Sequence, residues 1–152
     1  MTDIKNKILN SRHVCSKFII NTVSNDVIDY IASKLNKGAN FIQIRQGNIT
    51  SKAFFEIALK LRQLTSMFGG ILIIEDRLDI AKLVKSDGIF IDNDSIEYKF
   101  LSSLIDENMI IGSYPTDFDN SDYVLSDKTC KNKLTYITND NKAHYRAIQE
   151  VL

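Results

Sequence analysis

Short apolar runs that alternate with amphipathic segments are the feature of this sequence that most constrains its fold. Apolar runs at residues 17–21, 41–45 and 71–74 are each followed by apolar residues at helical spacing, among them Val27 and Ile31. Such alternation is typical of parallel strands that are joined by crossover helices. The sequence therefore predicts an α/β fold built on a mostly parallel sheet.

The alternation of predicted strands and helices continues as far as residue 112. Gly38 ends the first predicted helix, and Thr50 or Ser51 precedes the second. The run at residues 71–74 is almost purely apolar, as expected of a strand that is buried on both faces. We predict further helices over residues 78–84 and 96–105, and further strands over residues 89–91 and 109–112.

Beyond residue 112 the pattern changes. Residues 114–121 separate the fifth strand from a candidate at 123–125, and they are fewer than the dozen or so residues that a helical crossover needs. Residues 134–137 are a seventh strand candidate, and residues 142–152 predict a terminal helix. A full (β/α)8 barrel typically takes about 250 residues. The prediction is a reduced TIM-type (β/α) barrel of about seven strands in one domain, either open or completed by dimerisation.

Composition excludes several classes of function. The 19 basic residues balance the 19 acidic ones, so net charge does not indicate binding to nucleic acid or to an anionic membrane. No apolar run approaches the roughly 20 residues that span a bilayer. Cys15 and Cys130 belong to no CxxC or Cys/His cluster, which argues against a disulfide framework or a zinc site. We expect a cytoplasmic protein whose partners are small phosphorylated substrates, with homo-oligomer formation left open.

Polar residues at the ends of the predicted strands are the candidates for chemistry, because ligands bind there in parallel sheets. Gln43 and Arg45 alternate along the second strand and therefore point to the same side. An amide beside a guanidinium suits the oxygens of a pyrophosphate group. The alternatives are a polar barrel interior and an ion pair between Arg45 and Asp76.

Carboxylates follow the next two predicted strands. Glu75 and Asp76 end the third strand, and Asp92 and Asp94 follow the fourth. Carboxylate oxygens from neighbouring strand ends suit Mg²⁺, which also takes up water and phosphate oxygens. The competing interpretation is that Asp76 caps the following helix and that the stretch after residue 91 is a turn.

The remaining polar residues give weaker indications. Hydroxyl groups and one lysine lie near the fifth and sixth strand ends, at Ser113, Thr116, Ser126, Lys128 and Thr129. His13 and His144 lie away from the predicted strand ends, so no histidine is placed to act as a general base. Nucleophilic catalysis has no support without a Cys/His or Ser/His arrangement.

The motifs at these strand ends resemble the thiamine phosphate synthase family, which includes the thiazole tautomerases. Gln43-Ile44-Arg45-Gln46-Gly47 is similar to the family's Gln-Leu-Arg-Glu-Lys. Residues 73–81 (Ile-Ile-Glu-Asp-Arg-Leu-Asp-Ile-Ala) are similar to its Ile-Asn-Asp-Arg-Val-Asp-Leu-Ala, and residues 87–94 and 110–113 follow its Asp-Gly and Ile-Ile-Gly segments. The resemblance covers roughly residues 17–125, and residues 113–152 are shortened relative to the family.

The resemblance implies an activity and roles for individual residues. The family joins hydroxymethylpyrimidine pyrophosphate to thiazole phosphate and releases pyrophosphate, with Mg²⁺ and electrostatic catalysis. It assigns catalysis to Arg45 and Asp76 and metal binding to Asp76 and Asp94. Substrate binding falls to four residues: Gln43, Arg45, Glu75 and Ser113.

The sequence also departs from the family's pattern. Gly47 stands where the family has a pyrophosphate-binding lysine, Glu75 where it has an asparagine, and Phe90 where it has a histidine. All six glycines precede residue 113, so the glycine-rich phosphate loops have no counterpart. These departures leave open an alternative, a catalytically inactive relative that binds a phosphorylated metabolite or a protein partner.

Overall fold

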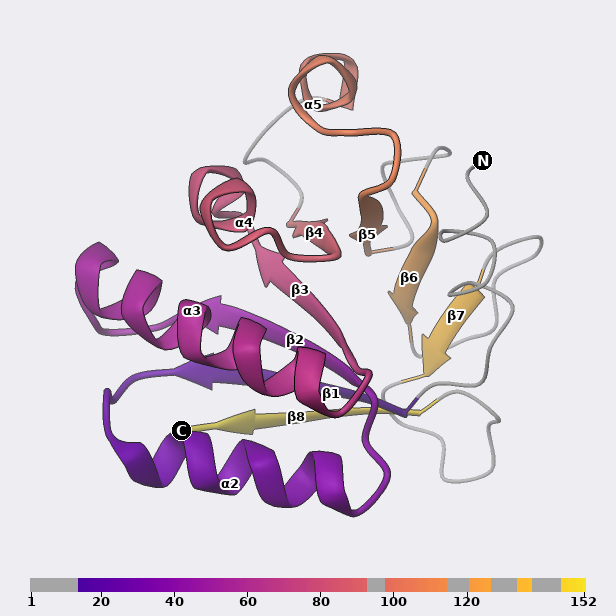
Figure 1. Ribbon diagram of the computed structural model, residues 1–152. Helices are drawn as coiled ribbons and strands as arrows, with labels where there is room; N and C mark the ends of the chain where they lie inside the picture. Colours follow the sequence, from indigo (N-terminus) through magenta and orange to yellow (C-terminus); the bar gives the residue numbers. More distant parts are fainter. Residues whose placement is uncertain (1–13, 93–97, 115–120, 127–133, 138–145) are drawn as a thin grey trace.

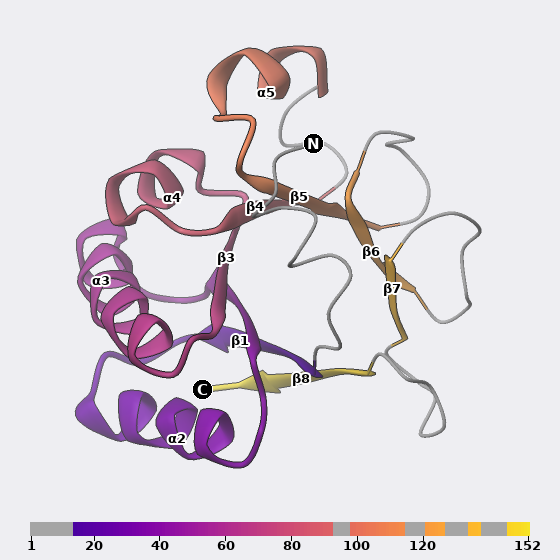
Figure 2. The same ribbon diagram turned by 45° about the vertical axis from the view of Figure 1, so that its right-hand side comes forward.

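The strands form a closed barrel of parallel strands in chain order, with β8 returning to pair with β1. This is a computed structural model, and it describes residues 14–92, 98–114, 121–126, 134–137 and 146–152. Figure 2 shows the strands arranged around a common axis. The strands are β1 (Val14–Ile20), β2 (Phe41–Gln46), β3 (Ile71–Glu75), β4 (Gly88–Ile91), β5 (Ile110–Ser113), β6 (Tyr123–Ser126), β7 (Leu134–Ile137) and β8 (Arg146–Val151). The predicted α/β, TIM-type class is confirmed.

The described helices all lie on the side of β1 to β5 (Figure 1). They are α2 (Asn25–Asn36), α3 (Ser51–Met67), α4 (Leu78–Val84) and α5 (Tyr98–Leu104), as the sequence pattern predicts. α3 begins after Thr50, whose side-chain oxygen accepts a hydrogen bond from the Ala53 amide at 3.1 Å. No helix in the described ranges is long and apolar enough to cross a membrane.

Alternate residues along each strand build two separate apolar layers. Side chains on the outer face of the barrel, such as Ile42 and Ile74, pack with Ile31, Phe54 and other buried residues of the helices. Side chains on the inner face form a second cluster, which consists of Cys15, Phe41, Ile71, Ile73, Phe90, Ile110, Tyr123 and Leu125. This period of two decides which polar residues point into the barrel.

The C-terminal segment corrects the prediction from sequence. Residues 142–152 were expected to be a helix, but the part of this segment that the structure describes is strand β8. β8 pairs in parallel with β1, with Cys15 opposite Ala147 and Ile19 opposite Val151. In the part of the chain that the structure describes, the barrel therefore has eight strands instead of the seven predicted, and it closes within one chain.

Candidate functional site

The carboxyl ends of β2 to β5 bring a group of polar side chains to one mouth of the barrel. Arg45 and Glu75 are inward-facing residues at the ends of β2 and β3, and Asp92 follows β4 directly. Tyr114 follows β5 and packs edge-on against Phe90 inside the barrel. The end of the barrel where parallel α/β proteins bind ligands is therefore lined with charge.

Glu75 is the centre of this group. The residue is 1% exposed, and its carboxylate lies 3.2 Å from the Lys17 Nζ atom. It accepts a hydrogen bond from Gln43 Nε2 at 3.2 Å, and Arg45 Nη1 lies 3.6 Å from it. Arg45 Nη1 also lies 3.8 Å from an Asp92 carboxylate oxygen. The predicted alternative of an Arg45–Asp76 pair is replaced by pairs with Glu75 and Asp92.

Gln43 continues the network into the barrel. Its side chain is fully buried, and its Oε1 atom accepts a hydrogen bond from the Tyr123 hydroxyl at 2.7 Å. The Tyr123 ring has room because residue 112 is glycine: a Cβ atom there would lie 2.1 Å from the ring carbon Cζ. Both polar groups of the Gln43 amide are therefore bonded, which fixes its orientation.

Burial and neighbouring charges shift the acidity of the central pair. Burial raises the pKa of the Glu75 carboxyl above its ordinary value, and Lys17 and Gln43 counter that rise only in part. Burial also disfavours the charge on Lys17, but the Glu75 carboxylate and the Tyr114 hydroxyl outweigh it and raise the pKa of Lys17. Lys17 therefore stays an ammonium at neutral pH.

Asp76 has an unusual backbone conformation at the end of β3. Its φ angle is 59°, in the left-handed region that few residues other than glycine adopt. Its Oδ1 atom accepts a hydrogen bond from the Asp92 amide at 2.9 Å, and its own amide donates to the Phe90 carbonyl oxygen. The carboxylate therefore ties β3 to β4 instead of capping α4, whose N-cap residue is Arg77.

Carboxylate oxygens of Glu75, Asp76 and Asp92 lie within 4.8 Å of one another. Hard oxygen donors in this number are the chemistry that Mg²⁺ prefers. Because Glu75 is buried against Lys17, the partly exposed Asp76 and Asp92 are the two that are accessible to an ion. The donor set therefore fits Mg²⁺, the metal expected from the sequence.

The rest of the motif that begins at Asp76 has a structural role. The Arg77 guanidinium pairs with the Asp79 carboxylate at 2.8 Å, and it donates to Ser51 Oγ at 2.9 Å and to the Gln46 side chain. These contacts join the start of α4 to the start of α3 and the end of β2. They hold in place the turn that carries Asp76.

Not every predicted site residue joins the group at the barrel mouth. Ser113 is 1% exposed, and its Oγ atom has no hydrogen-bond partner among the described residues. Alternation along β5 places its side chain on the outer face with Ile111, opposite Gly112. Asp94 lies outside the described residues, as do Thr116, Lys128 and Thr129.

Lys17, Tyr114 and Tyr123 are members of the site that sequence reasoning missed. Lys17 is 4% exposed in the middle of β1, and its Nζ atom donates to the Tyr114 hydroxyl at 3.1 Å. The one signal for it was a lysine inside an apolar strand, in step with the inward-facing Cys15. The two tyrosines had no comparable signal, because their partners come from distant strands.

Gly47 marks a position where the structure leaves no space for a side chain. A Cβ atom there would lie 2.1 Å from Asn21 Oδ1 and 2.7 Å from the Ile20 carbonyl oxygen. Asn21 Oδ1 accepts a hydrogen bond from the Asn48 amide at 2.7 Å, so the asparagine is itself held in place. The lysine that the resemblance leads one to expect here is excluded by packing.

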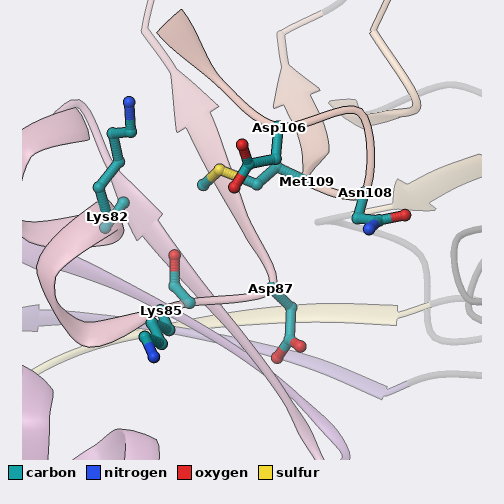
Figure 3. Close-up of a pocket in the computed structure, with 8 residues that line it drawn as sticks. Lys82, Lys85, Asp87, Asp106, Asn108 and Met109 are labelled. Carbon is teal, nitrogen blue, oxygen red and sulfur yellow. The ribbon is translucent and has the colours of Figure 1, made fainter.

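A recess of about 480 Å³ lies at the opposite end of the barrel. Its lining includes Lys82, Lys85, Asp87 and Asp106. In Figure 3 the Lys82 and Lys85 side chains point in opposite directions, and the carboxylates of Asp87 and Asp106 lie apart from each other. Asp87 is already bonded to Arg62 and to the Leu72 amide. The charges balance and do not converge, so the mouth described above remains the candidate site.

Fold and site together define a parallel α/β barrel with an acidic and cationic mouth. The family described as Thiamine monophosphate synthase (TMP-TENI) matches residues 15–119. The chain therefore belongs to the thiamine monophosphate synthase family. The thiamine phosphate pyrophosphorylase of Pyrococcus furiosus has a similar fold, with a TM-score of 0.76 at 18% identity, covering 93% of this chain and 87% of that one.

Curated relatives match only part of their own length. The thiamine-phosphate synthase of Dictyoglomus thermophilum is 34% identical over 85 residues, which are 56% of this chain and 38% of that protein. The thiamine-phosphate synthase of Methanococcus maripaludis strain C5 is 33% identical over 105 residues, or 68% of this chain and 50% of that protein. The match thus spans half or less of these relatives.

Proposed function

We propose that this chain is a thiamine phosphate synthase-like protein of the cytoplasm. It would join hydroxymethylpyrimidine pyrophosphate to thiazole phosphate and release pyrophosphate. The observation that carries the proposal is the position of Arg45, a half-exposed guanidinium that lies 3.6 Å from Glu75 and 3.8 Å from Asp92, two of the three carboxylates whose oxygens lie within 4.8 Å of one another. A guanidinium can bind two oxygens of a pyrophosphate group at once, and carboxylates can hold the counter-ion that such a group needs.

In this proposal Asp76 and Asp92 would hold Mg²⁺, with Asp94 as the further ligand expected from sequence. The ion would supply positive charge that stabilises pyrophosphate as a leaving group. The left-handed backbone at Asp76 is consistent with this role, because strained residues are often found at functional sites.

The chain's own side chains would act by binding and orientation. Arg45 would bind the pyrophosphate oxygens at the mouth, and Gln43, bonded on both sides, would fix Glu75 beneath it. Such catalysis is electrostatic and requires no nucleophile.

The direct test is turnover by the purified full chain with both substrates and Mg²⁺, measured as thiamine phosphate formed. We expect activity in the wild type and a loss of about 100-fold or more in Asp76→Asn, as for removal of a charged group from a transition-state site. Asp29→Asn is the matched control, because Asp29 is an exposed aspartate on α2.

An inactive wild-type protein that nevertheless binds pyrophosphate would overturn the proposed activity. It would support the alternative of a non-catalytic relative that binds a phosphorylated metabolite. Equal activity in the wild type and in Asp76→Asn would remove Asp76 from the reaction.

A further inference from the structure

The buried Glu75 carboxylate has two cations within reach, and they differ in position. Lys17 approaches Glu75 from the barrel interior, with its Nζ atom 3.2 Å from Glu75 Oε2. Arg45 approaches Glu75 from the barrel mouth, with its Nη1 atom 3.6 Å from Glu75 Oε1 and a side chain that is 44% exposed. Lys17 is therefore the closer counter-charge, and Arg45 keeps access to solvent.

Lys17 is held where a ligand at the mouth does not reach it. Its ammonium group donates a hydrogen bond to the Tyr114 hydroxyl at 3.1 Å. It also lies over two aromatic rings, 5.7 Å from the Phe90 centroid and 5.6 Å from the Tyr114 centroid. With a side chain that is 5% exposed, Lys17 acts on Glu75 and not on solvent.

A buried carboxylate without a counter-charge is strongly unfavourable, so the loss of Lys17 has a specific consequence. Among the described residues Arg45 is the nearest remaining cation, and its long, flexible side chain can turn inward from its 3.6 Å contact to make direct hydrogen bonds with Glu75. It would then leave Asp92, which is 3.8 Å away, and withdraw from the mouth.

We propose that Lys17 is a positioning residue, which satisfies Glu75 from inside the barrel and so leaves the Arg45 guanidinium at the mouth to bind pyrophosphate. The effect on Arg45 follows from the geometry alone. The consequence for pyrophosphate rests on the proposed function, so the two are measured separately.

The first experiment measures the accessibility of Arg45 in the full chain. Phenylglyoxal modifies exposed guanidinium groups, and peptide mass spectrometry gives the rate at each arginine. We expect Lys17→Gln to slow modification of Arg45 about fivefold, while Lys17→Arg keeps it within about twofold of the wild type, because it keeps the charge. Arg62, paired with Asp87 away from the mouth, is the internal reference in every digest.

The double variant Lys17→Gln/Glu75→Gln separates positioning from loss of structure. Without charge on residue 75, nothing draws Arg45 inward, and its modification rate should return to that of the wild type. The Lys17→Gln amide can still donate to Glu75, which favours folding of the single variant. The same Arg45 rate in the wild type and in Lys17→Gln would overturn the inference.

The second experiment measures the affinity for inorganic pyrophosphate with Mg²⁺ by calorimetry, well below the melting temperature. We expect Lys17→Gln to weaken binding about tenfold and the double variant to restore it. Should the double variant stay as weak as Lys17→Gln, Lys17 would contact the ligand itself, against a positioning role.

The two experiments fail in different ways. A wild-type protein that binds no pyrophosphate, with the expected modification rates of Arg45 across the variants, would contradict the proposed function and support the positioning role of Lys17. A wild-type protein that binds pyrophosphate, with Arg45 modification rates that are equal in all variants, would support the proposed function and contradict the positioning role of Lys17.

Discussion

At the scale of the residue, the interior of the barrel combines apolar packing with a small polar network. Gln43, Arg45, Glu75 and Asp76 could be predicted as site residues, because alternation and strand ends can be read from one sequence. Lys17 could not be predicted as a site residue, because its role depends on Glu75, a partner 58 positions away. The identity of a buried counter-charge is decided by the fold and not by local pattern.

Lys17→Met should destabilise the protein through the charge it leaves behind. Leaving a buried charge without any partner costs about 3–5 kcal/mol, and Arg45 can compensate part of that cost, so we expect a fall between about 1 kcal/mol and that size in the free energy of unfolding. Urea unfolding measures it, with Lys60→Met on the exposed face of α3 as the control. A loss below about 1 kcal/mol would show that the pair is solvated.

Gly112→Ala should disturb the bond between Tyr123 and Gln43. The new methyl group would lie 2.1 Å from Tyr123 Cζ, and overpacking of this kind costs about 1–3 kcal/mol. In a Tyr123→Leu background the same change should cost less than half as much, because the ring is gone. Gly70→Ala is the control, since the nearest atoms to its Cβ lie at 3.4 Å. Equal costs in the two backgrounds would contradict the account.

At the scale of the element, β8 is the segment whose secondary structure the sequence predicted wrongly. The spacing of Ala147, Ile148 and Val151 fits a helix, and alanine, glutamine and glutamate favour one. The structure shows a strand, because β1 would otherwise present an unpaired edge that β8 can satisfy. A tertiary demand of this kind overrides local propensity and cannot be read from the segment itself.

β8 is also clamped to α2 by Glu150. This carboxylate accepts a hydrogen bond from the Tyr30 hydroxyl and pairs with Lys34 at 2.9 Å. Burial opposes its ionisation, but Tyr30 and Lys34 outweigh burial and lower the pKa of Glu150 below its ordinary 4.5. The stabilisation is therefore present above pH 4.5 and is lost as the pH falls through the lower, folded-state pKa.

Glu150→Gln should lower the free energy of unfolding by roughly 1 kcal/mol at neutral pH, the upper range for partly exposed pairs. The difference from the wild type should shrink toward zero in acid, where Glu150 is protonated. Urea unfolding at neutral and acidic pH checks this, with the exposed Glu56→Gln on α3 as the control. A difference that does not change with pH would rule out the clamp.

At the scale of the whole molecule, the two halves of the barrel are built differently. Helices α2 to α5 connect the strands from β1 to β5, and the rhythm of the sequence predicted them. The later strands are joined through residues 114–122, 127–133 and 138–145, each shorter than a usual helical crossover. The closed ring of eight strands was not predictable, because closure depends on long-range pairing between β8 and β1.

The central claim is that Arg45 and Asp76 belong to one pyrophosphate and Mg²⁺ site, and calorimetric titration of the full chain with inorganic pyrophosphate tests it most directly. We expect binding that is about tenfold tighter with Mg²⁺, a loss of about tenfold or more in Arg45→Gln, and no Mg²⁺ effect in Asp76→Asn. Absence of binding to the wild type, or the same affinity in all three proteins with and without Mg²⁺, would contradict it.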